Sequence, residues 1–345
     1  METTYEIRES QKYKVCFSPE YNYVFNKHNG IFARWGSTKE QDPDYCKFGA
    51  EILDIEVTTK CAGPGGKPCP FCYKSNTLNG INMGFDTFKK IIDKMPDTLT
   101  QIAFGADAQA TSNPDLFKMM EYARYKKIVP NITVADISDD TADKLAKLCG
   151  AVAVSRYSNY NICYDSVKKL VDRGMKQVNI HYMLSKETYE DAFKTIDDYK
   201  NEPRIKGLNA IVFLSLKQKG RGTKYNTVTE DEFKKLIDYA FKKKVPIGFD
   251  SCSANKFLKA VAGREDYGEL AMLVEPCESS CFSSYIGVNA EFFPCSFAEG
   301  SGEWVDGIDV LECKDFVRDI WNHPRVNKFR KTLLDCHRNC PIYNV

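Results

Sequence analysis

Three cysteines are grouped on one short stretch of the chain: Cys61, Cys69 and Cys72, with Phe71 just before the last. They follow an apolar, β-branched run that ends at Thr58. Thiolates grouped in this way can hold a zinc ion, with a fourth ligand from elsewhere, or an iron–sulfur cluster. On a four-iron cluster, three cysteines leave one iron without a protein ligand. That iron is open to a substrate or cofactor, which is what a catalytic site needs.

A second group of cysteines lies near the other end of the chain: Cys277, Cys281, Cys295, Cys336 and Cys340. Thiolates spaced in this way suit a structural zinc knot nearly as well as an iron–sulfur cluster. Cys313 is a spare candidate. The isolated cysteines are expected to be small buried hydrophobes: Cys16, Cys46, Cys149 and Cys163.

The composition limits the other functions that the chain could have. Its 345 residues carry a net charge of +1, so no overall field recruits nucleic acid or an anionic membrane. No apolar run approaches the roughly 18 residues that span a bilayer, and the N-terminus lacks a signal peptide. Without a secretory signal, fourteen cysteines indicate metal or catalytic sites more than disulfides. We therefore expect a cytoplasmic protein.

Strand-like and helical patterns alternate from residue 51 to about 250. The expected strands cover 52–58, 101–104, 131–135, 151–155, 177–183, 210–216 and 246–249. The expected helices cover 86–95, a stretch opened by Asn113-Pro114, 138–149, 162–173, 187–200 and 230–243. Repeated βα units predict a parallel sheet, either an open α/β barrel or a doubly wound sheet. Both bind ligands at the carboxyl ends of the strands, where the first cysteine loop falls.

The flanking segments differ from this central series. Residues 1–50 alternate around Asn29-Gly30, which is a hairpin signal, and predict a small β extension. Residues 251–345 contain a hairpin pattern turning at Asn289-Ala290 and two short helices, near 314–322 and 324–334. We therefore predict three domains: 1–50, 51–250 and a smaller cysteine-rich unit at 251–345.

The first cysteine loop resembles that of the radical S-adenosylmethionine (radical SAM) enzymes, because Cys69-Pro70-Phe71-Cys72 follows a strand. In that family three cysteines bind a [4Fe–4S] cluster whose free iron chelates SAM. An electron then cleaves SAM to a 5′-deoxyadenosyl radical that abstracts hydrogen from substrate. The resemblance implies a partial (βα)6 TIM-like barrel with a β-hairpin extension. Seven residues separate Cys61 from Cys69, more than the family usually has. This Gly- and Pro-rich insertion is expected to loop out without moving the thiolates.

Other matches follow the strands in order. The segment FGADAQATSNPDL resembles the family's GGE segment, whose backbone contacts the SAM amino group, and Ser155-Arg156 lies where the family contacts the ribose or carboxylate. The stretch FLSLKQKGRGT resembles a strand-end segment of SPASM-containing members. The resemblance thus implies a set of cofactor-binding candidates: Phe71, Gly105, Ala106, Asp107, Ser155, Arg156 and Met183.

Two candidates for catalysis come from the later strands. His181 shares a strand face with Met183, and it is either a catalytic group or a hydrogen-bonded core residue. Cys252 follows the last strand-like run, and it is a hydrogen-atom donor, a cluster ligand or a bystander.

The later cysteines resemble the SPASM/twitch extension of peptide-modifying radical SAM enzymes. That resemblance implies one auxiliary [4Fe–4S] cluster, held by Cys277, Cys281, Cys295 and either Cys336 or Cys340. It also implies a peptide or protein substrate, modified by crosslinking, epimerisation or side-chain oxidation, and an electron donor such as flavodoxin or ferredoxin. Because no leader-binding domain is recognisable before the barrel, a small metabolite or nucleotide is the first alternative substrate. A non-catalytic zinc-binding scaffold is the alternative from another class.

Overall fold

Parallel strands in chain order form the centre of the structure, a computed structural model that describes residues 4–343. These strands are β5 (Ile52–Glu56), β6 (Gln101–Gly105), β7 (Val129–Val134), β8 (Ala151–Arg156), β9 (Val178–Leu184), β10 (Ala210–Ser215) and β11 (Ile247–Phe249). Every strand predicted for the central series is therefore present. Their order does not reverse, as it does in a doubly wound sheet, and the sheet stays open between β11 and β14.

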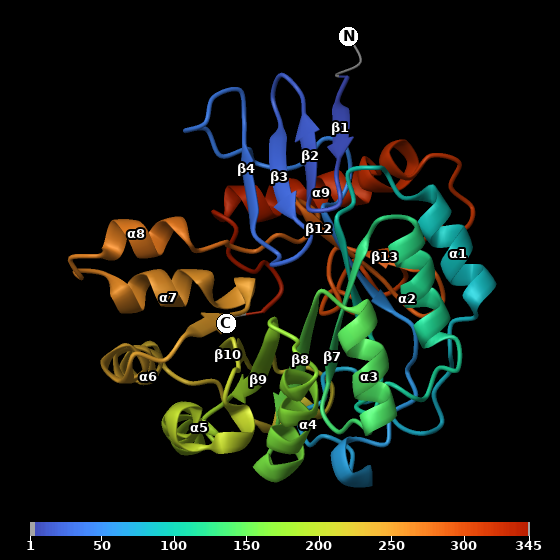
Figure 1. Cartoon of the computed structure of the whole chain (residues 1–345). Helices are drawn as coiled ribbons and strands as arrows, with labels where there is room; N and C mark the ends of the chain where they lie inside the picture. Colours follow the sequence, from blue (N-terminus) through green and yellow to red (C-terminus); the bar gives the residue numbers. More distant parts are fainter. Residues whose placement is uncertain (1–3, 344–345) are drawn as a thin grey trace.

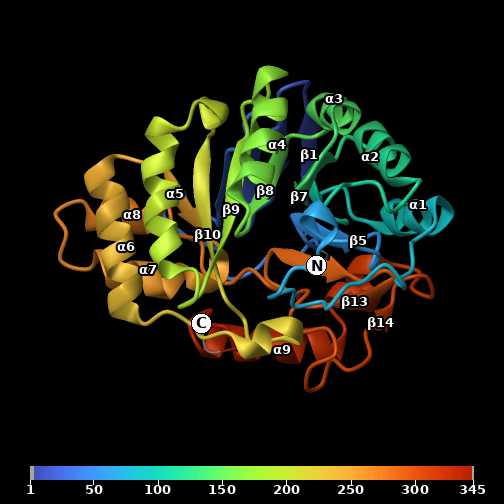
Figure 2. The ribbon, with the colours of Figure 1, turned by 90° about the horizontal axis from the view of Figure 1, so that it is seen from below.

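Helices on the outside of this sheet connect its strands, as Figure 2 shows. They are α1 (Phe85–Lys94), α2 (Leu116–Tyr125), α3 (Asp139–Leu148), α4 (Tyr160–Asp172), α5 (Tyr189–Asn201), with a 3-10 turn at Pro203–Ile205, and α6 (Glu230–Lys243). The predicted βα series is confirmed, apart from shifts of a few residues at the ends.

The two faces of the central strands differ in character. Along β9 the buried residues alternate with partly exposed ones, and Ile180 and Tyr182 belong to the core beneath the helices. His181 and Met183 therefore lie on the inner face, and Ser155 of β8 is paired with His181. The inner face is the more polar one, as a ligand site requires.

The N-terminal extension is larger than the predicted hairpin. It is a four-stranded antiparallel sheet of β1 (Glu6–Glu9), β2 (Tyr13–Phe17), β3 (Asn22–Asn26) and β4 (Phe32–Trp35). Asn29-Gly30 does form the turn between β3 and β4, with Gly30 at a φ of 75°. Tyr23 donates its hydroxyl to the Thr98 carbonyl at 2.8 Å, which attaches the sheet to the main body. β1 is charged and partly exposed, so it carries little hydrophobic signal, whereas β2 buries Lys14 and Cys16.

The C-terminal segment continues the central sheet. Its strands are β12 (Ser283–Ile286), β13 (Glu291–Phe293) and β14 (Ile308–Asp309), and β12 pairs in parallel with β5. The hairpin between β12 and β13 is confirmed, with Ala290 at a φ of 66°. A π-helical turn (Phe316–Trp321) and α9 (Pro324–Asp335) match the two predicted helices. In Figure 1 the β1–β4 sheet lies next to α9.

Two helices were not predicted: α7 (Ala254–Val261) and α8 (Tyr267–Met272). They precede the C-terminal strands. The boundaries of the three predicted domains stay predictions, and residues 1–3 and 344–345 of the outer two lie outside the described residues.

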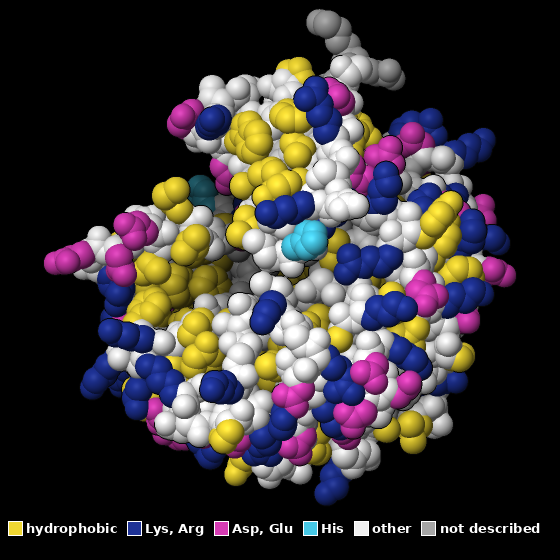
Figure 3. Space-filling view, in the orientation of Figure 1, with side chains coloured by type: hydrophobic (Ala, Val, Ile, Leu, Met, Phe, Trp, Pro, Cys, Tyr) yellow, Lys and Arg dark blue, Asp and Glu magenta, His cyan; other side chains and the backbone are white. Residues whose placement is uncertain are grey.

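The surface carries charges of both signs. Figure 3 shows Lys and Arg side chains interspersed with Asp and Glu, and hydrophobic side chains gathered around a hollow near α7 and α8. Within residues 4–343, no helix combines the length and the apolar character needed to cross a bilayer.

Candidate functional site

The first cysteine loop leaves the carboxyl end of β5, and its three thiols are partly buried. The inserted residues form a 3-10 turn at Pro64–Gly66. Gln109 donates its amide to the Gly63 carbonyl at 2.9 Å, and the Gly65 N–H donates to Asp136 at 3.0 Å. The insertion is therefore held against the loops that follow β6 and β7, at the same edge of the sheet.

A short segment after β10, the basic strap (residues 217–222), holds this loop from the other side. Arg221 donates from Nε to the Cys69 carbonyl at 2.8 Å and from Nη1 to the Asn76 carbonyl at 3.2 Å. Its backbone N–H donates to the Cys72 carbonyl at 3.0 Å. Gly220 makes this approach possible, because a Cβ there would lie 2.4 Å from the Tyr73 carbonyl oxygen. The strap thus fixes the backbone at two of the three cysteines.

Gly63 and Gly66 provide a test of the insertion. A Cβ on Gly63 would lie 1.9 Å from the Lys67 carbonyl oxygen, whereas one on Gly66 meets nothing within 4 Å. Both residues have positive φ, at 77° and 73°. Gly66→Ala should cost about 1–2 kcal/mol from backbone strain alone. Gly63→Ala must also displace the chain between Cys61 and Cys69, so it should cost more and reduce metal loading at the loop.

Urea unfolding and the metal content of the purified variants measure this prediction. Equal losses of stability and metal in the two variants would contradict it, since only Gly63 is sterically blocked.

In the segment after β6, most of the polar groups are hydrogen-bonded within the protein, and one backbone carbonyl is not. Asp107 is 1% exposed, and its carboxylate accepts the N–H groups of Gln109, Thr111 and Ser112 at 2.9–3.3 Å. The Gly105 carbonyl accepts the Val57 N–H, and the Asp107 carbonyl accepts the Ala110 N–H. Between them, the Ala106 carbonyl has no donor among residues 4–343. Of the three backbone carbonyls, it is the one with both lone pairs free of a donor from the described part of the chain.

The remaining cofactor candidates lie on both faces of the sheet. Phe71 stacks on Tyr157, with ring centroids 5.6 Å apart, and is 9% exposed. Ser155 and Met183 line the inner face. Arg156 lies on the opposite face from Ser155, where its 1%-exposed side chain forms a bidentate ion pair with Asp191 of α5. Its guanidinium therefore packs α5 onto the sheet.

His181 lies inside the curve of the sheet, with Nδ1 3.5 Å from the Thr133 hydroxyl. Burial lowers the pKa of His181 to about 4, and Asp250 offsets this only partly. Its imidazole is therefore neutral at physiological pH and carries no proton to donate as imidazolium.

The lowered pKa of His181 makes stability depend on pH. Between about pH 6.5 and pH 4 the unfolded chain binds a proton at His181 that the folded chain excludes. The free energy of unfolding therefore decreases as the pH falls through this range. In His181→Asn, the loss of stability on going to low pH should be smaller by on the order of 1–3 kcal/mol. Urea unfolding near pH 7.5 and pH 4.5 measures it. His28→Asn is the control, because His28 is exposed. The same pH dependence in His181→Asn and wild type would contradict the prediction.

The later cysteines surround a cavity of about 240 Å³. Four of its lining residues are Cys252, Cys277, Cys295 and Cys340. Cys281 does not line it and has no exposed surface, because it packs against Phe282 and the N-terminal sheet. The thiol of Cys336 donates to the Leu333 and Asn339 carbonyls at 3.2 and 3.0 Å. Of the five C-terminal cysteines predicted as ligands, the structure brings three to the cavity.

Sequence reasoning missed Asp54, which lines this cavity together with Lys217 and Asp250. Burial raises the pKa of Asp54 to about 6. Lys217 is paired with Asp250, which holds its pKa above the usual value although burial opposes the charge. The signal for Asp54 lay in its strand, where two carboxylates two residues apart interrupt an apolar run.

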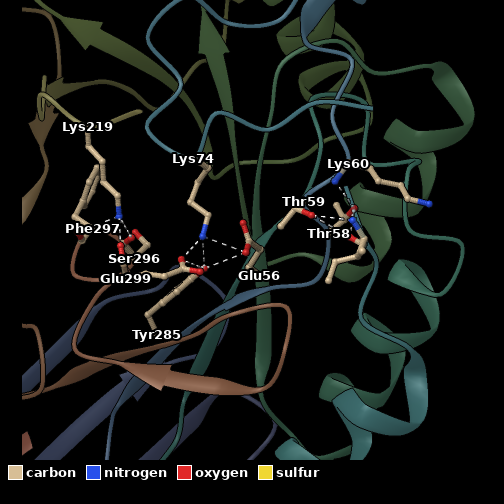
Figure 4. A network of polar contacts seen from close by, with 11 residues as sticks. Glu56, Thr58, Thr59, Lys60, Lys74, Lys219, Tyr285, Ser296, Phe297 and Glu299 are labelled. Carbon is tan, nitrogen blue, oxygen red and sulfur yellow. Dashed lines mark hydrogen bonds and ion pairs between the residues drawn. The ribbon is translucent and has the colours of Figure 1, made fainter. Parts of the chain in front are cut away.

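A polar network joins the first cysteine loop to the C-terminal one (Figure 4). Lys74, which follows Cys72, pairs with Glu56 at 3.2 Å and with Glu299. Tyr285 of β12 donates to Glu56 at 3.2 Å and to Glu299 at 3.0 Å. On the other side, Lys219 of the basic strap donates to carbonyls just beyond Cys295: Ser296, Phe297 and Glu299.

No family model matches this chain, and no curated protein does. Among solved structures, SuiB of Streptococcus suis matches with a TM-score of 0.69 at 14% identity, over 93% of this chain and 90% of SuiB. SuiB bound to its precursor peptide SuiA gives 0.68 at 13% identity, and SuiB bound to SAM gives 0.63 at 12%. Both cover 94% of this chain and 90% of SuiB. The chain has the radical SAM fold. These matches support the resemblance that the first cysteine loop gave.

On the radical SAM fold, the carboxyl edge of the strands holds the first cysteine loop, and the open side of the sheet holds the cavity. Within residues 4–343, no three His, Cys, Asp or Glu side chains converge closely enough to hold a single metal ion. Four thiols line the cavity, together with the carboxylates of Asp54, Asp250 and Glu278. Thiolate sulfur is the donor that iron–sulfur clusters use, and zinc accepts it as well.

Proposed function

We propose that the chain is a radical SAM enzyme that modifies a peptide or protein. The observation that carries the proposal is the loop of Cys61, Cys69 and Cys72, with partly buried thiols at the ligand-binding edge of the sheet. A [4Fe–4S] cluster bound there would supply the electron that cleaves SAM to methionine and a 5′-deoxyadenosyl radical, which abstracts a hydrogen atom from substrate.

The chain's own residues would position these groups. Arg221 holds the cysteine loop, and the Ala106 carbonyl accepts the amino group of SAM. Ser155 and Met183 line the inner face beside the neutral His181. The sheet and its outer helices exclude water from a reactive radical.

A peptide substrate is supported by the likeness to SuiB, which has been solved with its precursor peptide SuiA. Crosslinking, epimerisation and side-chain oxidation all begin with hydrogen abstraction, so they need the same geometry. We further propose that a flavodoxin or ferredoxin supplies the electron, and that the cavity thiols hold one auxiliary [4Fe–4S] cluster.

The test begins with protein purified without oxygen and reconstituted with iron and sulfide. SAM and a strong reductant are added, and 5′-deoxyadenosine is measured against the matched Cys69→Ala/Cys72→Ala variant. Formation by the wild type alone is the expected result. Zinc retained in place of iron would favour the zinc-binding scaffold, and iron without SAM cleavage would contradict the enzyme proposal. Products formed from peptides, and not from small metabolites or nucleotides, identify the substrate class.

A further inference from the structure

The cavity on the open side of the sheet is lined by thiols from four separate segments. Cys252 lies in the 3-10 turn that follows β11, Cys277 precedes β12, Cys295 follows β13, and Cys340 follows α9. No sequence motif joins Cys252 to the other three, because 24 residues separate it from Cys277. The fold alone makes them neighbours.

The position of Cys252 follows from the sheet. β11 is the last strand of the parallel series, and β12 pairs with β5 at the other end of that series. The cavity is lined by Ile52 of β5 and by Asp250, which follows β11, so it lies in the gap between these two strands. The turn after β11 must therefore face the C-terminal cysteines across the gap.

The two competing thiols already have structural roles. Cys281 has no exposed surface and belongs to the core cluster of Tyr21, Phe282 and Leu333, which also includes Cys277. Its carbonyl accepts the Cys46 N–H at 2.9 Å, which fixes the backbone as well. Cys336 follows the last residue of α9 and bonds the carbonyls around it. Neither thiol lines the cavity.

The lining of the cavity also carries charges of both signs. Lys217 lines it with a side chain that is only 3% exposed, and Ser279 lies 3.4 Å from the Cys277 sulfur. Lys219, which does not line the cavity, donates to the carbonyls of two residues that do, Ser296 and Phe297. Asp54, Asp250 and Glu278 line it as well, and Asp250 is already paired with Lys217.

We infer that Cys252 is the fourth ligand of the auxiliary iron–sulfur site, with Cys277, Cys295 and Cys340. This inference rests on the proposed function, which supplies the kind of cluster. It assigns Cys252 to metal binding in place of hydrogen-atom donation, and it removes Cys281 and Cys336 from the ligand set.

The test uses the full chain carrying Cys61→Ala, Cys69→Ala and Cys72→Ala, so that any cluster left belongs to the cavity. After anaerobic reconstitution, iron, acid-labile sulfide and the electron paramagnetic resonance spectrum of the reduced protein are measured. About four irons per chain are expected. Adding Cys252→Ala or Cys340→Ala should lower the iron to fewer than about one. The matched controls, Cys281→Ala and Cys336→Ala, should keep the iron and the spectrum unchanged.

Circular dichroism confirms that each variant is folded, and Cys252→Ser replaces the alanine variant if it is not. Iron and an unaltered spectrum retained by the Cys252 variant would overturn the inference, as would their loss in the Cys281 variant or zinc in place of iron. Because SAM cleavage is not a readout, failure of this ligand set is distinct from failure of the proposed function. The latter would appear as an absence of 5′-deoxyadenosine in chains that hold both clusters.

Discussion

Arg221→Met should abolish most SAM cleavage while leaving the auxiliary iron in place, and Lys219→Met should remove the auxiliary iron while leaving 5′-deoxyadenosine formation. The two residues are two positions apart on the basic strap, and they bond different cysteine loops. Arg221 donates to the carbonyls of Cys69 and Asn76, whereas Lys219 donates to those beyond Cys295. Arg221 thus holds the backbone at Cys69, and Lys219 holds the backbone just beyond Cys295; both cysteines are proposed metal ligands.

The expected size of the loss in the two variants follows from what is known of groups that support a metal ligand. Loss of an outer partner of a metal ligand costs about 10–100-fold in metal affinity or activity. Arg221 provides three of these bonds through its side chain, so a loss near the upper end is expected. Arg221→Lys is the informative intermediate, because one ammonium cannot reproduce the fork of donors.

Iron and sulfide contents measure the total cluster content of both sites. A change in the electron paramagnetic resonance spectrum of the reduced protein on adding SAM reports the site of the first cysteine loop alone. If both variants lost iron equally from both sites, the strap would be a general structural element without separate roles. If neither lost any, the two loops would hold their clusters unaided.

Local patterns in the sequence predicted the centre of this structure. The strands from β5 to β11 follow from short apolar runs, and the shared face of His181 and Met183 follows from the two-residue period of a strand. The loop of Cys61, Cys69 and Cys72 could be identified because its residues are close in the chain. All of these features depend on neighbours a few positions apart.

What could not be predicted depends on pairing between distant segments. The pairing of β12 with β5 joins residues more than two hundred positions apart, and nothing local records it. That pairing contributes to the cavity that Cys252 and Cys277 both line, a neighbourhood that the spacing of the cysteines did not predict. The first strand of the β1–β4 sheet escaped prediction for another reason, because Glu6–Glu9 is charged and partly exposed. Tyr23 and Lys14 bond this sheet to the main body.

Arg34→Met should destabilise the protein by roughly 3–5 kcal/mol, because it leaves buried carboxylates without their cation. Arg34 lies on β4 with a side chain 7% exposed, and its Nη1 lies 3.2 Å from Glu51, itself 1% exposed. It also pairs with Glu275, and its guanidinium lies 3.5 Å from the centre of the Phe282 ring. Glu275 and Glu278 flank Cys277, so the same side chain ties the N-terminal sheet to the cavity.

The pH dependence of this loss has a definite sign. Burial raises the pKa of Glu51 well above its usual value, and burial with Glu275 nearby raises that of Glu278 to about 7. Removing Arg34 raises both further, so the variant folds with these groups protonated. The folded variant then binds more protons than its unfolded chain, and its stability falls as pH rises. The loss should therefore be smaller near pH 5 than near pH 8.

Two further variants show whether buried charge is the cause. Arg34→Met/Glu51→Gln should recover part of the loss, because it removes the carboxylate that is left unpaired. Arg8→Met should leave stability unchanged, since the Arg8–Glu6 pair is exposed to solvent. Urea unfolding at both pH values measures all four proteins. Arg34 would act through packing on Phe282 if the loss of stability were the same at both pH values and Glu51→Gln did not reduce it. Reduced auxiliary iron in Arg34→Met would then show that the N-terminal sheet supports the metal site through this one side chain.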